Sequence, residues 1–231
     1  MGRLSSLLSE PAALLNLQDD PREWFLKTDG AGAPSLRYIP PAGVNINDPS
    51  TAVVGAVLKR VIEIEGATGV TLRGLTITAT APTFLDSYEC PSGGDWSIHR
   101  GAAVFVEASS NITIEGLTFD QVSGNALMFS NEVMDSTVRK CLFKDVGDSA
   151  ISMLGSTQQM IGTTGKGLFP SHNLIESNVV DVVGVYGKQT SAYFKAKSRA
   201  NTVRKNVFMN GPRAGVVKNP LFFQNFEPLN D

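Results

Sequence analysis

The sequence predicts an all-β chain wound as a right-handed parallel β-helix, a solenoid of about five coils with inserted loops and an N-terminal β-hairpin region. An eight-residue phrase recurs five times, most closely as STVRKCLF at 136–143 and NTVRKNVF at 201–208. The copies are rich in Val, Ile, Phe and Thr in short alternation, which is typical of strands. The 231 residues include 22 glycines, which favour turns between such strands.

The last residue of each phrase anchors the repeat. These anchors lie 42, 24, 37 and 28 residues apart, and they are Ile77, Phe119, Phe143, Val180 and Phe208. A basic period near 24 with longer gaps is typical of a solenoid that carries loops between some coils. We therefore expect the five anchors to stack in one interior column, with insertions at 79–100, 155–172 and 185–189.

A second phrase, in which an Ala precedes apolar residues, accompanies the last four copies, for example GNALMF and DSAISM. The pattern predicts two short strands in each coil with a tight corner between them. Asn178 and Asn206 occupy the sixth position of their phrases, where Asn can adopt a left-handed backbone conformation and hydrogen-bond to the next coil. Right-handedness follows from the strong preference of parallel crossovers. The alternative, an antiparallel β-sandwich, does not require one phrase repeated in one direction.

Composition narrows the class of protein. A formal net charge of −2 argues against nucleic acid or an anionic membrane as a partner, and no apolar run reaches the ~18 residues of a spanning helix. Cys90 and Cys141 have no paired spacing and the two histidines form no metal motif, so we predict no metal site and no cofactor. Glu10 and Pro11 interrupt the mildly apolar N-terminus, which does not read clearly as a signal peptide.

Several ordered motifs carry a family resemblance: DDPREWFLKTDGAGAPSLRYIPPAG (19–43), PSGGDWSIHRGAAVFVE (91–107), GDSAI (147–151), GKQTSAYFKA (187–196) and NGPRAG (210–215). From about residue 20 to 216 the chain resembles right-handed β-helix proteins of the pectate-lyase-like superfamily. It is most similar to large microbial and algal members related to β-helix glycoside hydrolases. The resemblance implies an N-terminal extension and hairpin over 1–58, a β-helix over 59–231, an extracellular setting, and a polysaccharide partner, either neutral or anionic.

The chain departs from this family pattern in two places. Asp181 and Val182 stand where relatives carry a His-Glu pair, and relatives continue after residue 215 with further coils. The resemblance therefore implies that C-terminal coils are missing. Phe222, Phe223 and Phe226 are expected to fold over the open end of the last coil or to mediate association.

Glycoside hydrolysis requires two carboxylates roughly 5–10 Å apart, and three aspartates near the predicted insertions are candidate catalytic residues. The register puts Asp148 beside residues 188–191, so it could act as the general acid or base, or it could simply cap a turn. Asp145 and Asp181 could serve as its partner or be solvated turn residues; Asp181 also follows Asp120 and Lys144 in a predicted charge ladder. Lyase chemistry on a uronate would instead use Lys188 and Arg213, although no acidic calcium cluster accompanies them.

The expected substrate-binding residues lie in or beside the insertions: Trp96, His99, Lys188, Gln189, Tyr193 and Arg213. Trp96 could stack on the face of a sugar. Eight Lys or Arg residues and no Asp or Glu lie between 186 and 218, which indicates either a groove for an anionic polymer or a solvated outer face. Two functions remain open: a carbohydrate-active enzyme, hydrolase-like or lyase-like, and a non-catalytic β-helix, which would be either a carbohydrate-binding scaffold or an incomplete family member.

Overall fold

The computed structural model describes residues 20–27, 35–51, 55–90, 96–156 and 168–219, and the chain divides into two units, residues 1–54 and 55–231. The first unit holds an antiparallel hairpin of β1 (Trp24–Lys27) and β2 (Ser35–Tyr38), in which Trp24 lies opposite Tyr38. This confirms the predicted N-terminal hairpin. The second unit contains the solenoid.

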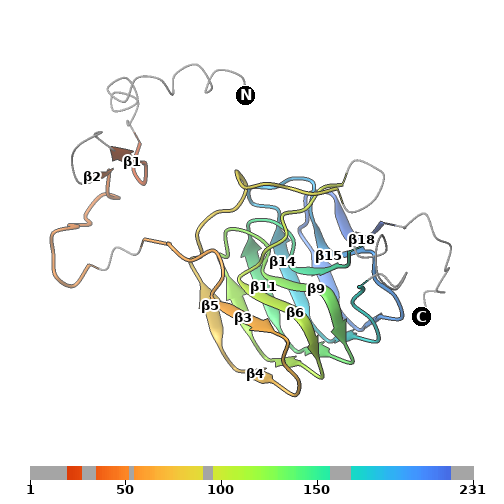
Figure 1. Ribbon diagram of the computed structural model, residues 1–231. Helices are drawn as coiled ribbons and strands as arrows, with labels where there is room; N and C mark the ends of the chain where they lie inside the picture. The colour runs from red at the N-terminus through yellow and green to blue at the C-terminus, as the bar shows by residue number, and fades with distance from the viewer. Residues whose placement is uncertain (1–19, 28–34, 52–54, 91–95, 157–167, 220–231) are drawn as a thin grey trace. The chain divides into compact units, whose positions relative to one another are not determined.

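Three parallel sheets form the walls of the solenoid, and each coil adds one strand to each sheet (Figure 1). The first sheet contains β3 (Ile62–Glu65), β6 (Val104–Ser110), β9 (Leu127–Met134), β12 (Ile151–Leu154), β15 (Ser191–Ala196) and β18 (Ala214–Asn219). The second contains β4 (Thr71–Arg73), β7 (Thr113–Glu115), β10 (Thr137–Arg139), β13 (Leu174–Glu176) and β16 (Thr202–Arg204). The third contains β5 (Thr76–Thr78), β8 (Thr118–Asp120), β11 (Leu142–Val146), β14 (Val179–Val183) and β17 (Val207–Met209). Five sets of three strands, one set for each coil, therefore lie within the described residues, and the predicted parallel β-helix is confirmed.

The prediction of two strands per coil was wrong, because the eight-residue phrase spans two strands. In STVRKCLF the chain leaves β10 and enters β11 at Lys140, whose φ of 55° lies in the left-handed region. The same position in the other coils also has positive φ, at Gly74, Gly116, Ser177 and Lys205. The left-handed residue thus precedes Asn178 and Asn206, and the expectation that these asparagines are themselves left-handed was wrong as well.

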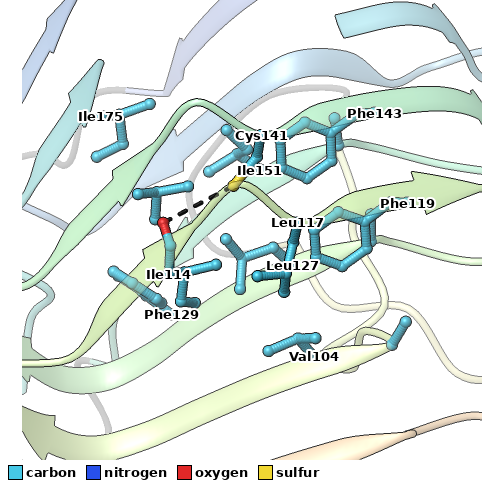
Figure 2. Close-up of a cluster of buried hydrophobic side chains, with 14 of the residues drawn as sticks. Val104, Ile114, Leu117, Phe119, Leu127, Phe129, Cys141, Phe143, Ile151 and Ile175 are labelled. Carbon is cyan, nitrogen blue, oxygen red and sulfur yellow. Dashed lines mark hydrogen bonds between the residues drawn. The ribbon is translucent and has the colours of Figure 1, made fainter. Parts of the chain in front are cut away.

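The predicted interior column is confirmed. Ile77, Phe119, Phe143, Val180 and Phe208 are paired in register along the third sheet. The first four are buried, and Phe208 packs partly buried against the same core. The rings of Phe119 and Phe143 stack with centroids 4.6 Å apart and an interplanar angle of 4° (Figure 2). Stacking of identical side chains is a direct result of the parallel register.

The predicted hydrogen bonding of the Asn column from coil to coil is confirmed. Asn178 Nδ2 donates to Val138 O at 3.0 Å and to Asn206 Oδ1 at 2.9 Å, and Asn178 Oδ1 accepts from the Cys141 amide at 2.9 Å. A second ladder, at the corner before the second sheet, connects Ser136, Asn173 and Asn201 in the same way. These side chains satisfy backbone groups that would otherwise be buried without partners.

Charged ladders follow the outer faces of the sheets. On the second sheet, basic and acidic residues alternate in register through Arg73, Glu115, Arg139, Glu176 and Arg204. On the third sheet, Lys144 lies between Asp120 and Asp181, as the sequence predicts. Exposed pairs of this kind contribute only about 0–1 kcal/mol each.

The first insertion, residues 79–100, positions the candidate site. Its described parts, 79–90 and 96–100, follow β5 and run along the corner of the solenoid toward β15 and β18, drawn in yellow in Figure 1. The Arg100 guanidinium fastens its far end by donating to Ser130 Oγ, Leu154 O and Gly155 O at 2.8–3.1 Å. The aromatic residues predicted to cap the last coil, Phe222, Phe223 and Phe226, lie outside the described residues.

Replacing the central ladder residue tests how far the fold depends on these amides. Asn178→Ala leaves the Cys141 amide without the partner that Asn178 Oδ1 provides and removes the bond to Val138 O, so we expect a loss of about 1–3 kcal/mol in the free energy of unfolding. Urea denaturation with an unchanged m-value measures it. Asn210→Ala is the matched control, because Asn210 is exposed and its amide donates to Asp181. Equal losses for the two variants would contradict the assigned role of the ladder.

Candidate functional site

Asp148 lies at the corner between the third and first sheets, where β11 leads into β12. Its amide donates to Gly124 O at 3.1 Å in the preceding coil, and its carbonyl accepts from the Gly184 amide at 3.0 Å in the next. Only 2% of its surface is exposed. Gly147 allows this close packing, because a Cβ there would lie 2.1 Å from Ser123 O.

Two segments far away in the sequence close over the Asp148 carboxylate. From the first insertion, the Tyr88 hydroxyl and the Thr83 hydroxyl donate to Asp148 Oδ2 at 3.2 and 3.4 Å. From the 185–189 segment, Gly187 packs against Oδ1 so closely that a Cβ there would lie 2.2 Å away. Oδ1 itself accepts no hydrogen bond in the described structure. Asp148 thus joins three segments at one point.

Burial sets the electrostatics of this carboxylate. Loss of hydration raises the pKa of Asp148, and the hydrogen bonds from Tyr88 and Thr83 oppose the rise. The pKa of the Tyr88 phenol is likewise raised, first by burial and then by the charge of Asp148. The pair therefore favours a phenol that keeps its proton and a carboxyl that holds its own proton to higher pH than usual.

A pocket of about 280 Å³ opens beside Asp148. Its aromatic wall is the pair Phe84 and Tyr186, whose rings stack with centroids 5.5 Å apart. Ile98 and Phe194 add apolar side chains to the lining, and Asn125 adds a polar side chain. The Asn125 amide is fixed, because Nδ2 donates to His99 O and Gly101 O while Oδ1 accepts from the Ser149 amide. A mainly apolar pocket with a few fixed polar groups is typical of a small-ligand site.

Two of the predicted binding residues, Lys188 and Gln189, line this pocket together with Asp148. The predicted contact between Asp148 and this segment is thus present, through Gly187. The Lys188 ammonium donates to Gly184 O at 2.6 Å and to Val185 O at 2.9 Å. Its main visible role is to fold the segment 184–188 into a compact turn.

Three predicted binding residues lie beside the pocket lining. The Trp96 ring is tilted against Phe194 with centroids 6.5 Å apart, and the Arg213 guanidinium lies 4.8 Å from the centre of the Trp96 ring. His99 Nδ1 is 3.0 Å from Ser87 O, and its Nε2 is 3.9 Å from Asp86 Oδ2. These residues hold the far part of the first insertion on the outer face of the first sheet.

Of the remaining predicted residues, Tyr193 and Asp181 do not line the pocket beside Asp148, and Asp145 lines the adjoining one. Tyr193 is 3% exposed, belongs to the interior core, and donates its hydroxyl to Met153 Sδ. Asp181 lies on the outer face of the third sheet and accepts from Asn210 Nδ2 at 2.6 Å. Asp145 lines a neighbouring pocket and lies 3.6 Å from Lys144 Nζ.

Sequence reasoning did not single out the residues that complete the pocket: Thr83, Phe84, Tyr88, Asn125 and Tyr186. The predicted insertions were the available signal, since Thr83, Phe84 and Tyr88 belong to 79–100 and Tyr186 belongs to 185–189. Among the described residues, no three His, Cys, Asp or Glu side chains lie together as a metal site, and no helix is long and apolar enough to cross a bilayer.

The raised pKa of Asp148 predicts a pH-dependent stability. The folded protein binds the proton of Asp148 more tightly than the unfolded chain, in which the carboxyl has its ordinary pKa of 3.8. The protonated carboxyl therefore contributes its full stabilisation below pH 3.8. It is lost as the pH rises from 3.8 through the raised folded value. We expect Asp148→Asn to remove this loss, so that its free energy of unfolding gains on the wild type as the pH rises toward neutral.

Denaturant unfolding between pH 3 and pH 8 measures the difference. Asp181→Asn is the matched control, because its carboxylate lies on the outer face, and its difference from the wild type should not follow the same course. Parallel pH profiles for the wild type and Asp148→Asn would contradict the expected effect.

Comparison with family models matches residues 58–225 to the right-handed β-helix region. Searches of curated proteins and of solved structures gave no match. The family match covers most of the chain and agrees with the three stacked parallel sheets. The chain therefore belongs to the right-handed β-helix family.

Proposed function

We propose that this protein is a carbohydrate-binding β-helix that holds a sugar residue of a polysaccharide in the pocket beside Asp148. The supporting observation is the combination of an aromatic wall, Phe84 and Tyr186, with fixed polar groups in one pocket. Aromatic faces suit the apolar faces of sugar rings, and polar groups of fixed orientation suit their hydroxyls. Tyr186 is 53% exposed, so its ring is accessible to a ligand.

In this proposal Asp148 positions the pocket and does not contact the ligand. Its carboxylate is buried, and it is bound to the insertion through Tyr88 and Thr83. These contacts fix the segment that carries Phe84, and the 185–189 segment that carries Tyr186 packs on the other side. A preformed pocket reduces the entropy cost of binding.

Loss of the aromatic platform should abolish most of the binding. We expect Tyr186→Ala to weaken polysaccharide binding at least ~10-fold, equivalent to about 1.4 kcal/mol, with little change in stability because the side chain is half exposed. The probe is a panel of neutral β-glucans, xylans and mannans with anionic galacturonans and alginates, measured by calorimetry on the full chain.

Leu75→Ala is the matched control, since Leu75 is a comparably exposed apolar side chain outside both pockets. Binding that Tyr186→Ala leaves unchanged would overturn the assignment of the pocket. A loss that Leu75→Ala reproduces would show a general surface effect and count equally against it.

Hydrolysis is the second candidate, and the raised pKa of Asp148 favours it, because a general acid must keep its proton near the working pH. Asp145 in the adjoining pocket would be the partner carboxylate. The burial of Asp148 weighs against this function, because its carboxyl would have to become accessible when a ligand binds.

Release of reducing ends separates the two functions. Hydrolysis through Asp148 predicts that Asp148→Asn lowers turnover at least ~100-fold, as expected for loss of an acid or base, while binding is retained. Binding without release of reducing ends supports the scaffold. Release that persists in Asp148→Asn would exclude Asp148 as the acid.

A further inference from the structure

A second pocket of about 310 Å³ adjoins the first at the same corner of the solenoid. Its lining includes Gln121, Ser123, Asp145 and Val185, and it shares Tyr186 with the first pocket. The tyrosine ring therefore lies between two hollows and contributes a surface to both.

The two pockets follow each other along the path of the chain around the corner. In three successive coils the residues of the second pocket come shortly before those of the first: Gln121–Ser123 before Asn125, Asp145 before Asp148, and Val185 before Gly187. The second pocket therefore lies toward the third sheet and the first pocket toward the first sheet. A ligand that fills both would cross the solenoid at the corner, transverse to its axis.

The charge of the described lining favours an uncharged ligand. The two pockets together contain two carboxylates, Asp148 and Asp145, and one ammonium, Lys188. Two backbone carbonyls, Gly184 O and Val185 O, accept hydrogen bonds from that ammonium. A chain of uronates or sulfated sugars would require more cationic than anionic side chains at the site, and the described lining has no such excess.

Among the described basic residues between 186 and 218, only Lys188 lines either pocket. Arg204 lies on the outer face of the second sheet, 2.9 Å from Glu176. Lys205 lies at the corner between the second and third sheets. Arg213 lies over Trp96. Arg204, Lys205 and Arg213 therefore lie on different parts of the solenoid, and none of the three lines either pocket.

We propose that the two pockets form a single groove for an uncharged linear oligosaccharide of at least two units, which passes over the Tyr186 ring. This proposal rests on the proposed function of the first pocket. Phe84 supports the Tyr186 ring from behind, so the ring can act as a fixed platform between the two sugar units. Gln121, Ser123 and Asp145 supply hydrogen-bonding groups for the second unit.

Two glutamines provide a matched test, since Gln121 lines the second pocket and Gln189 lines the first. Alanine is compatible with the left-handed backbone of Gln121, because Ala79 occupies the corresponding corner of the first coil with φ 53°. Calorimetry on the full chain uses cello-, xylo- and manno-oligosaccharides of one to six units, with oligogalacturonides of the same lengths as the anionic series.

We expect affinity to rise at least ~10-fold between one unit and three units and then to level off. Gln121→Ala should weaken binding of the longer oligosaccharides and leave that of the single sugar unchanged, whereas Gln189→Ala should weaken binding at every length. Affinity that is independent of length but still falls in Tyr186→Ala would overturn the groove and leave the first pocket standing.

Tighter binding of oligogalacturonides than of the neutral series would overturn the assignment of an uncharged ligand. Absence of any binding that depends on Tyr186 would overturn the groove together with the proposed function on which it rests.

Discussion

Hydrogen bonding between successive coils is the interaction on which the whole structure depends. In a parallel β-helix each strand pairs only with the coil before and the coil after, so every coil must have nearly the same path. The corners repeat a left-handed residue at equivalent positions, even where that residue is Lys or Ser and the conformation costs roughly 1 kcal/mol. The polar ladders of Asn173 and Asn178 supply partners for backbone groups at these corners.

The stacking rule explains which features the sequence could predict. The anchor residues recur because one interior column has the same environment in each coil, so the column from Ile77 to Phe208 was readable from the repeat. The number of strands in each coil could not be predicted, because a Lys or Ser at a left-handed corner cannot be distinguished in the sequence from a strand residue. The second amide ladder was hidden because it begins with Ser136 and becomes Asn only in later coils.

The candidate site was predictable only where it follows the register. The contact of Asp148 with the 185–189 segment comes from stacking, but Tyr88 and Thr83 reach it through a loop that has no repeat. Whether Tyr193 lies on the inner or the outer face of its sheet depends on the strand register, since a shift of one residue exchanges the two faces. Its neighbour Phe194 faces outward onto Trp96, and Tyr193 joins the core. Asp148 thus connects the repeating coils to a loop that has no repeat. Burying its carboxyl group makes this connection costly in stability at neutral pH.

The amide columns also give the solenoid a direction in which it can lengthen. Asn173 hydrogen-bonds to Asn201 and Asn178 to Asn206, in each case one 28-residue coil later. In the second coil the equivalent positions are Ile112 and Leu117. An Asn accepts from an identical Asn placed beside it, so a duplicated 28-residue unit at this end would join its parent through the bonds already used there. In the first two coils the same columns bring apolar residues together, Val70 beside Ile112 and Leu75 beside Leu117. Growth of this chain by tandem copying of the 28-residue unit would therefore reuse side-chain bonds that the structure already contains.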